Sequence, residues 1–144
     1  MLLLDVNALI ALVWPARQHH AAVFTWFTRH AAKGWATCAF TEAALVRILC
    51  QPAVVHRALD LNIASALLRQ NLAMAGHQRL PLDFSFYAVL RHSSGGVVGH
   101  RQVTDACLLT AAMRAGGKLL SLDRGVHPLL ATEEERRRHL LLLG

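Results

Sequence analysis

Short apolar runs alternate along this chain with longer stretches of helical character, and this alternation restricts the fold more than any other feature. The expected strands cover residues 1–6, 35–38, 79–84, 118–122 and 139–143. Short, continuous apolar runs are typical of buried strands. Strands that take turns with helices favour a parallel sheet, because each helix carries the chain back across it. The sequence therefore predicts an α/β fold, with a central, mostly parallel sheet flanked by helices.

The expected helices end at residues that interrupt helical geometry. They cover residues 8–13, 20–32, 41–50, 55–74, 87–92 and 104–115. Asn7 can cap the first helix, and Pro15 stops it because the residue before a proline is pushed away from helical geometry. The Gly116-Gly117 pair closes the last one. No repeat or long linker divides the chain, so we expect a single domain over residues 1–144.

Four acidic residues lie at the boundaries between these elements. Asp5 and Asp123 each follow an apolar run, whereas Glu42 and Asp105 each open a helix. In an open α/β sheet, these positions line the crevice beyond the carboxyl ends of the strands. Acidic groups that lie so near one another cannot all stay ionised without a cation. The pattern therefore predicts a divalent-metal site formed by four carboxylates.

Each of these acids also has an ordinary structural explanation. A carboxylate in the first turn of a helix, such as Glu42 or Asp105, gains about 0.3–1 kcal/mol from the helix dipole. Asp123 precedes Arg124-Gly125 and suits a turn. Asp5 is harder to explain in this way, because a charge that closes a buried strand loses hydration. Helix caps and turns account poorly for all four acids together, so we favour the metal site.

Three further residues are candidates for contacts around the acids. Asn7 follows Asp5 by two positions and can cap a helix or orient water at a metal from outside the ligand shell. Thr104 precedes Asp105, where it serves as a helix cap or contacts the cleft. Arg124 follows Asp123 and suits either an exposed loop or a phosphate contact. For all three, the structural role and the functional role stay open at this point.

The chemistry of the candidate ligands selects the cation and the reaction. Carboxylate oxygens favour Mg²⁺ or Mn²⁺ over zinc, and the nine histidines form no zinc-binding motif. Such an ion polarises a phosphoryl oxygen and promotes the ionisation of water. The sequence has no Gly-rich phosphate loop and no evident nucleophilic serine or cysteine with a partner base. Metal-assisted hydrolysis of a phosphodiester is therefore the favoured reaction.

Composition narrows the substrate and the compartment. The net charge is +6, and if four of the nine acids share one pocket, 15 Lys and Arg face only five acids elsewhere. A basic surface around an acidic pocket suits a polyanion, although the charge alone is equally consistent with solubility. No apolar segment is long enough to span a membrane, and no signal peptide is evident. Three widely spaced cysteines favour a reducing compartment, so we expect a cytoplasmic protein.

Six further segments carry a resemblance to a known family: Leu4-Asp5-Val6-Asn7, Gly34-Trp35-Ala36-Thr37-Cys38, Thr41-Glu42, Gly99-His100-Arg101-Gln102-Val103-Thr104-Asp105-Ala106, Gly116-Gly117-Lys118-Leu119 and Leu122-Asp123-Arg124. They resemble the PIN-domain ribonucleases, and more closely the VapC-type toxins of bacterial toxin–antitoxin pairs. The resemblance spans nearly the whole chain in the right order, and the segment around Asp105 is its most specific part. Cys107 departs from it, since relatives often have an aromatic residue there.

The resemblance implies a function and a set of partners. It implies an endoribonuclease that depends on Mg²⁺, for which Mn²⁺ can substitute. It also implies that Asp5, Glu42, Asp105 and Asp123 form the acidic site. We expect Asp5, Asp105 and Asp123 to hold the metal, with Glu42 in support. The expected partners are an RNA substrate, a cognate antitoxin and a second copy of the chain, and the helix expected over residues 55–74 suits dimerisation or antitoxin docking.

Two alternatives belong to other classes of protein. The first is a PIN-like module that binds RNA or a protein without cleaving it, for which four intact acids have no evident use. The second is another α/β protein with an acidic cleft, such as a phosphotransfer receiver or a phosphatase. A receiver needs an acidic pair early in the chain, and the single acid of Asp5-Val6-Asn7 and the basic net charge fit this poorly.

Overall fold

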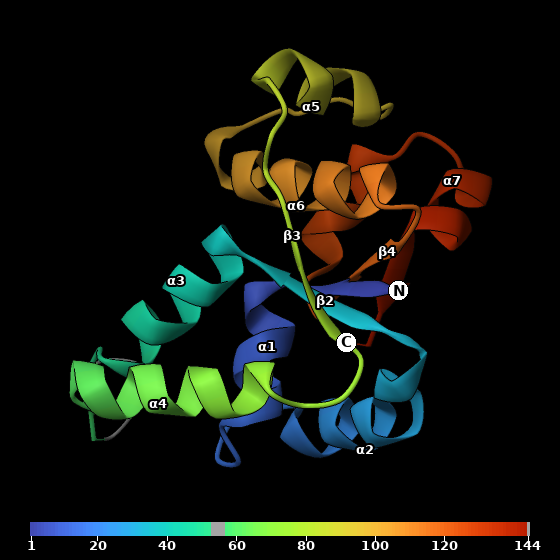
Figure 1. Cartoon of the computed structure of the whole chain (residues 1–144). Helices are drawn as coiled ribbons and strands as arrows, with labels where there is room; N and C mark the ends of the chain where they lie inside the picture. The colour runs from blue at the N-terminus through green and yellow to red at the C-terminus, as the bar shows by residue number, and fades with distance from the viewer. Residues whose placement is uncertain (53–56, 144) are drawn as a thin grey trace.

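A five-stranded, wholly parallel sheet forms the centre of the protein (Figure 1). The computed structural model describes residues 1–52 and 57–143. The strands lie in the order β3-β2-β1-β4-β5. Their bounds are Leu2–Leu4 for β1, Trp35–Cys38 for β2, His77–Leu80 for β3, Lys118–Ser121 for β4 and Leu140–Leu142 for β5. The predicted α/β class and parallel sheet are confirmed.

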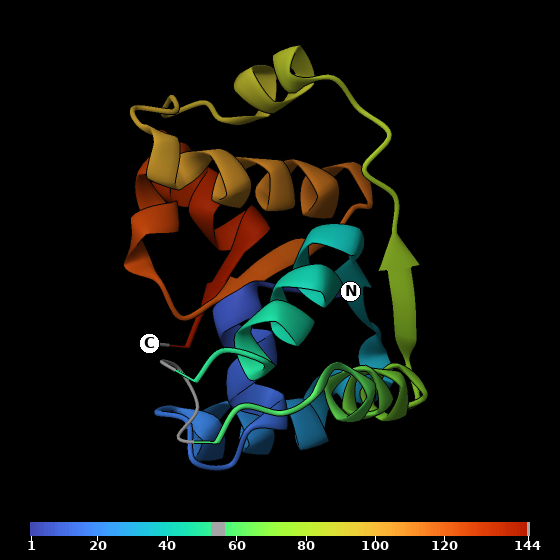
Figure 2. The same ribbon diagram turned by 90° about the vertical axis from the view of Figure 1, so that its left-hand side faces the viewer.

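Helices cover both faces of this sheet. The α-helices are α1 (Val6–Val13), α2 (His20–His30), α3 (Ala39–Leu49), α4 (Leu61–Leu72), α5 (Phe86–His92), α6 (Val103–Arg114) and α7 (Glu133–His139). Three short 3-10 helices are η1 (Ala31–Lys33), η2 (His100–Gln102) and η3 (Arg124–Leu129). Helices α5 and α6 lie over one face, and α1, α2 and α4 lie beyond the other (Figures 1 and 2). None of the helices in the described part of the chain is long and apolar enough to cross a membrane.

The side chains of β1 and β4 alternate between two apolar cores. Leu3 of β1 and Leu119 of β4 pack in the core under α6, whereas Leu4 and Leu120 pack in the core that faces α1. All four leucines are fully buried. Successive side chains of a strand point to opposite faces, so a strand covered on both sides is apolar throughout. This explains the apolar runs at β1 and β4. The edge strand β3 differs, because it is mostly polar and spans His77–Leu80 instead of the expected residues 79–84.

Several predicted helices begin at other residues. The helix expected over residues 41–50 begins at Ala39, and two others begin at aspartate caps. We expected Asn7 to cap a helix over residues 8–13, but α1 begins at Val6 and its N-cap is Asp5, whose Oδ1 accepts a hydrogen bond from the Val6 N–H. The helix expected over residues 55–74 begins only at Leu61, where the Asp60 side chain accepts from the Ile63 N–H at 2.9 Å. Residues 55 and 56 lie outside the described part. In both cases an aspartate caps the helix.

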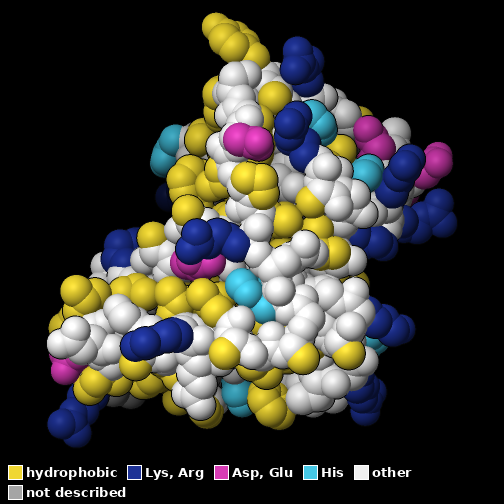
Figure 3. All heavy atoms as spheres, viewed as in Figure 1, with side chains coloured by type: hydrophobic (Ala, Val, Ile, Leu, Met, Phe, Trp, Pro, Cys, Tyr) yellow, Lys and Arg dark blue, Asp and Glu magenta, His cyan; other side chains and the backbone are white. Residues whose placement is uncertain are grey.

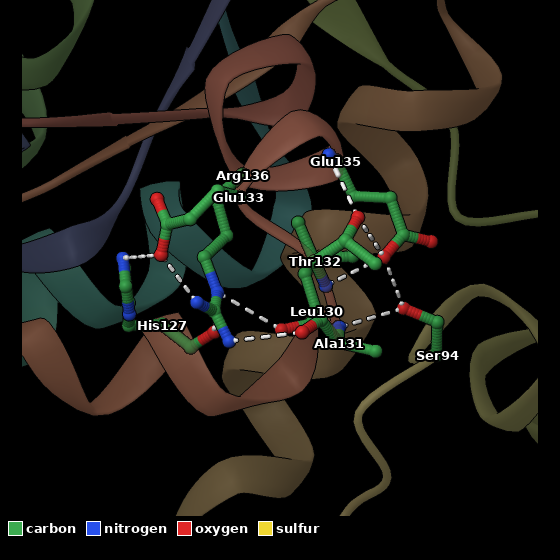
Figure 4. Close-up of polar contacts among 8 residues, drawn as sticks. All are labelled: Ser94, His127, Leu130, Ala131, Thr132, Glu133, Glu135 and Arg136. Carbon is green, nitrogen blue, oxygen red and sulfur yellow. Dashed lines mark hydrogen bonds and ion pairs between the residues drawn. The ribbon is translucent and has the colours of Figure 1, made fainter.

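A polar network attaches α7 to the segment that follows β4 (Figure 4). The Arg136 Nε donates to the carbonyl oxygens of His127 at 3.2 Å and Leu130 at 3.0 Å. The Glu135 carboxylate accepts from the Thr132 N–H and from the Ser94 hydroxyl, which ties α7 to the loop after α5. These contacts hold η3, the turn that follows Asp123, against the body of the protein.

Candidate active site

The order of the strands creates a crevice beside β1. The chain proceeds from β1 to β2 and β3 on one side, then crosses to β4 and β5 on the other. Leu4 of β1 pairs with Leu120 of β4, so the two strands end side by side. In open α/β sheets, ligands bind where the strand order reverses, beyond the carboxyl ends of the strands. The first strand runs from the N label toward α1 in Figure 1, so this end of the sheet faces the viewer in Figure 2.

Asp5 occupies this crevice at the end of β1. Its backbone N–H donates to the Leu120 carbonyl at 2.9 Å, which continues the pairing of β1 with β4 by one residue. Only 4% of its surface is exposed. Burial raises the pKa of the Asp5 carboxyl, and hydrogen bonds from Ser121 and Val6 act against that increase. A carboxylate this buried is costly unless its charge is compensated.

Ser121, which was not predicted as a site residue, links Asp5 to Asp123. The fully buried Ser121 hydroxyl donates to Oδ2 of Asp5 at 2.7 Å and accepts from the Asp123 N–H at 3.0 Å. One side chain therefore fixes both the carboxylate that ends β1 and the backbone that follows β4. A polar residue inside the apolar run Leu119-Leu120-Ser121-Leu122 was the available signal.

Asp105 faces Asp5 and Asp123 from the first turn of α6. The pKa of its carboxyl is raised to about 6, first by burial and then by the negative charges of Asp5 and Asp123. Within the described part of the chain, the Asp105 side chain accepts no hydrogen bond that would favour its charged form. The structure therefore brings together three of the four predicted acids as an electrostatically coupled group.

Asp123 is the exposed member of this group. Its Oδ1 accepts a hydrogen bond from the Gly125 N–H at 2.7 Å, which makes Asp123 the N-cap of η3. Its charge raises the pKa of both Asp5 and Asp105. The turn predicted at this position is thus present, and the same residue contributes to the acidic group.

Glu42 has other neighbours. Its Oε1 accepts from the Thr37 hydroxyl at 2.6 Å and lies 3.4 Å from Nε of Arg79. The Thr37 oxygen is also 2.8 Å from Nε2 of His77, so β2 and β3 together hold the Glu42 carboxylate. The negative charges that raise the pKa of Asp105 belong to Asp5 and Asp123, and Glu42 is not among them. Glu42 is therefore held on the β2–β3 side of the sheet.

The three candidate contact residues all lie on the surface. Asn7 is exposed in the first turn of α1, Thr104 is exposed beside Asp105 in α6, and Arg124 is exposed at the start of η3. Neither Asn7 nor Thr104 is a helix N-cap, because Asp5 caps α1 and Gln102 is the N-cap of α6. The capping roles considered for Asn7 and Thr104 are therefore wrong.

The donor set of the three aspartates fits a hard cation. Its side chains offer only carboxylate oxygens, and the mutual repulsion seen at Asp105 is what a divalent ion would relieve. In the described part of the chain, no group of three or more His, Cys, Asp or Glu side chains is arranged so that it could hold a metal ion. The aspartates as they stand are thus a coupled group of acids, not a complete coordination shell.

Comparison with known proteins gives consistent matches. The model of the PIN domain family matches residues 2–129. The chain is 45% identical over 129 residues to Ribonuclease VapC38 of Mycobacterium tuberculosis (strain ATCC 25618 / H37Rv). These residues make up 90% of this chain and 89% of that protein. It is 42% identical over 121 residues to Ribonuclease VapC39 of strain CDC 1551 / Oshkosh, covering 84% and 87% respectively. The crystal structure of VapBC2 from Rickettsia felis bound to a DNA fragment from their promoter shares the fold. Its TM-score is 0.65 at 13% identity, covering 98% of this chain and 97% of that one.

Proposed function

This chain belongs to the PIN domain family, and from that premise we propose that it is an endoribonuclease, the toxin of a toxin–antitoxin pair, that hydrolyses RNA phosphodiester bonds. The observation that carries the proposal is the coupling of Asp5, Asp105 and Asp123 at the reversal point of the sheet. The names of the curated relatives, which are ribonucleases, support it. The strongly basic remainder of the chain supports a polyanionic substrate.

The proposed cofactor is Mg²⁺, with Mn²⁺ as a substitute, held by Asp5, Asp105 and Asp123. When bound, such an ion polarises a phosphoryl oxygen and promotes the ionisation of water. The protein prepares two of the three carboxylates. Ser121 and the Val6 N–H orient Asp5, and the Gly125 N–H orients Asp123. Asp105, which lacks such bonds in the described structure, contributes a carboxylate whose pKa is raised by burial and by the charges of the other two aspartates.

The remaining candidates have supporting roles in this proposal. Glu42 supports the acidic site from the β2–β3 side, where Thr37 and Arg79 fix its orientation. Asn7, Thr104 and Arg124 are exposed near the three aspartates in sequence, which suits contacts with the RNA backbone. Amide, hydroxyl and guanidinium groups are common donors to phosphate oxygens.

Two protein partners complete the proposal. An exposed apolar surface on α5, formed by Phe86, Tyr87 and Leu90, supports a homodimer; Tyr87 is 79% exposed. A groove of about 540 Å³ between α3 and α4, lined by apolar residues such as Val46, Leu61 and Leu68, supports docking of the antitoxin. The three cysteines are free, which suits the proposed cytoplasmic location.

Cleavage of a structured RNA pool tests the proposed function. Purified protein is incubated with the pool in Mg²⁺, in Mn²⁺ and in EDTA, beside the Asp5→Ala variant. We expect cuts that require metal and vanish in the variant. Binding of RNA without metal-dependent cleavage would overturn the proposal in favour of a module that binds RNA without cutting it.

A further inference from the structure

A pocket opens at the end of the sheet where the strands begin, opposite the end that carries the three aspartates. Its volume is about 430 Å³, and its walls come from the start of β1, the segments before β2 and β4, and helices α2 and α7. This volume is within the range of small-molecule sites, about 300–1,000 Å³. Because the strands are parallel, the pocket and the three aspartates lie at opposite ends of the same sheet. It is therefore a separate site from the acidic group.

The lining of this pocket is basic. Lys33, Lys118 and Arg138 contribute to its walls together with His30, and no Asp or Glu is among the described residues that line it. The Lys118 Nζ donates to the Arg137 carbonyl at 2.6 Å, which fixes the ammonium group beside α7. We call this site, defined by Lys33, Lys118, Arg138 and His30, the basic pocket. Lys and Arg side chains lie along the right-hand edge of Figure 3, where Figure 1 draws the start of β1 between α7 and α2.

The charges of Arg138 and Lys118 also act on His139, which lies beside the basic pocket. His139, which neighbours Arg138 on α7, has a lowered pKa, first through burial and then through the charge of Arg138. Lys118 lowers it further, whereas Glu135 acts in the opposite direction. A concave site lined by cationic side chains favours anions over cations.

An aromatic surface lies beside these cations. Trp26 lines the pocket, and its ring stacks on that of His30, with centroids 4.6 Å apart and planes 12° apart. The Nδ1 of His30 is 2.7 Å from the Trp26 carbonyl oxygen, so Nδ1 carries the proton and donates. Cationic side chains beside a partly exposed aromatic ring are the combination with which proteins bind nucleotides, because cations contact phosphates and rings stack on bases.

Two glycines form the turns that line the pocket. Gly34 and Gly116, which both line it, have positive φ angles of 99° and 67°. A side chain at either position would strain the backbone. The turns that lead into β2 and β4 therefore place bare backbone in the pocket.

We propose that the basic pocket binds the phosphate group of a nucleotide, supplied either by a free mononucleotide or by an RNA strand. Arg138 and Lys33 contact the phosphate, and Trp26 lies where a base can stack. The RNA source rests on the proposed function, because it makes the pocket an additional contact for the substrate. The mononucleotide source does not depend on cleavage.

Calorimetric titration in EDTA tests this proposal, because RNA then binds without metal-dependent cleavage. The probes are inorganic phosphate, adenosine monophosphate and a short oligoribonucleotide. The variant is Arg138→Gln, and the matched control is Arg137→Gln, since Arg137 is the exposed neighbour on α7 and does not line the pocket. We expect the affinity for the bound probe to fall about tenfold in Arg138→Gln, as for loss of one phosphate contact, and to stay unchanged in Arg137→Gln.

The pattern of binding identifies the source of the phosphate. Tighter binding of adenosine monophosphate than of inorganic phosphate, lost in part in Trp26→Phe, indicates a free nucleotide. Binding of the oligoribonucleotide alone, weakened in Arg138→Gln, indicates an RNA strand. No saturable binding of any probe, or equal losses in the two arginine variants, would overturn the proposal. The same titration with Asp105→Asn separates the two sites. In this variant the basic pocket should bind the probe with the affinity of wild type, even if the proposed cleavage is absent.

Discussion

The two ends of the sheet differ in charge and in burial. At the carboxyl ends of β1 and β4, Asp5 is buried and Asp105 is partly buried, and the pKa values of both carboxyls are raised. At the amino ends of the same strands, Lys33 and Arg138 line an open pocket and are exposed. Burying like charges together raises the free energy of the folded protein, whereas exposed cations cost little. The acidic end therefore lowers the stability of the folded protein, whereas the basic end does not.

Asp105→Asn is expected to have the largest effect on activity. The substitution removes the carboxylate whose pKa is raised by the charges of both other aspartates. Residues that only orient a metal ligand typically cost up to about 100-fold when they are replaced, so loss of a ligand itself should lower RNA cleavage by more than about 100-fold. Initial rates in Mg²⁺ measure the loss. Asp83→Asn is the matched control, since Asp83 is an exposed aspartate outside the acidic group, and its rate should match wild type. Full activity of Asp105→Asn at saturating Mg²⁺ would remove Asp105 from the site.

Ser121→Ala should have the next largest effect. The variant removes the hydroxyl that orients Asp5 and holds the Asp123 backbone, so we expect activity or metal affinity to fall by about 10–100-fold. Ser93→Ala is the control, because Ser93 is also buried but its hydroxyl has no hydrogen-bond partner in the described structure. If both variants cleave RNA equally well, the link through Ser121 has no functional role.

Glu42→Gln should have a smaller effect on cleavage. The Gln side chain can still accept from Thr37, and the ion pair with the exposed Arg79 is weak, so the rate should fall by less than about tenfold. Initial rates beside those of Asp105→Asn measure this difference. A loss as large as that of Asp105→Asn would place Glu42 among the metal ligands.

The acidic end should also control stability in the absence of metal. The Asp105 carboxyl has a pKa of about 6 in the folded protein against an ordinary value of 3.8, so the folded state binds its proton more tightly. Its contribution to stability is therefore largest below pH 4 and is lost as the pH rises through about 6. In EDTA, the melting temperature of Asp105→Asn should equal that of wild type near pH 4 and exceed it by a few degrees at pH 7.

Thermal unfolding followed by circular dichroism measures this difference, with Asp83→Asn as the control. Adding Mg²⁺ at pH 7 should raise the melting temperature of wild type and leave that of Asp105→Asn unchanged. Equal melting curves for wild type and Asp105→Asn at every pH would contradict the coupling among the three aspartates.

The order of strands and helices could be predicted because it depends on local patterns. Apolar runs marked the buried strands, and three of the four acids at element boundaries do come together. The role of Ser121 could not be predicted, because its bond to Asp5 joins residues 116 positions apart. The position of Glu42 was equally hidden, since it depends on Arg79 and His77 of a neighbouring strand. Asp5 was identified as a site acid but not as a helix cap, because its place at the end of an apolar run assigned it to the strand.

Binding of Mn²⁺ tests the central claim of a metal centre most directly. Electron paramagnetic resonance measures free Mn²⁺ during a titration of wild type, Asp105→Asn and the Asp83→Asn control at pH 7. We expect saturable binding to wild type and to the control, and a loss of that binding in Asp105→Asn. Equal binding to all three proteins, or no saturable binding to wild type, would contradict it.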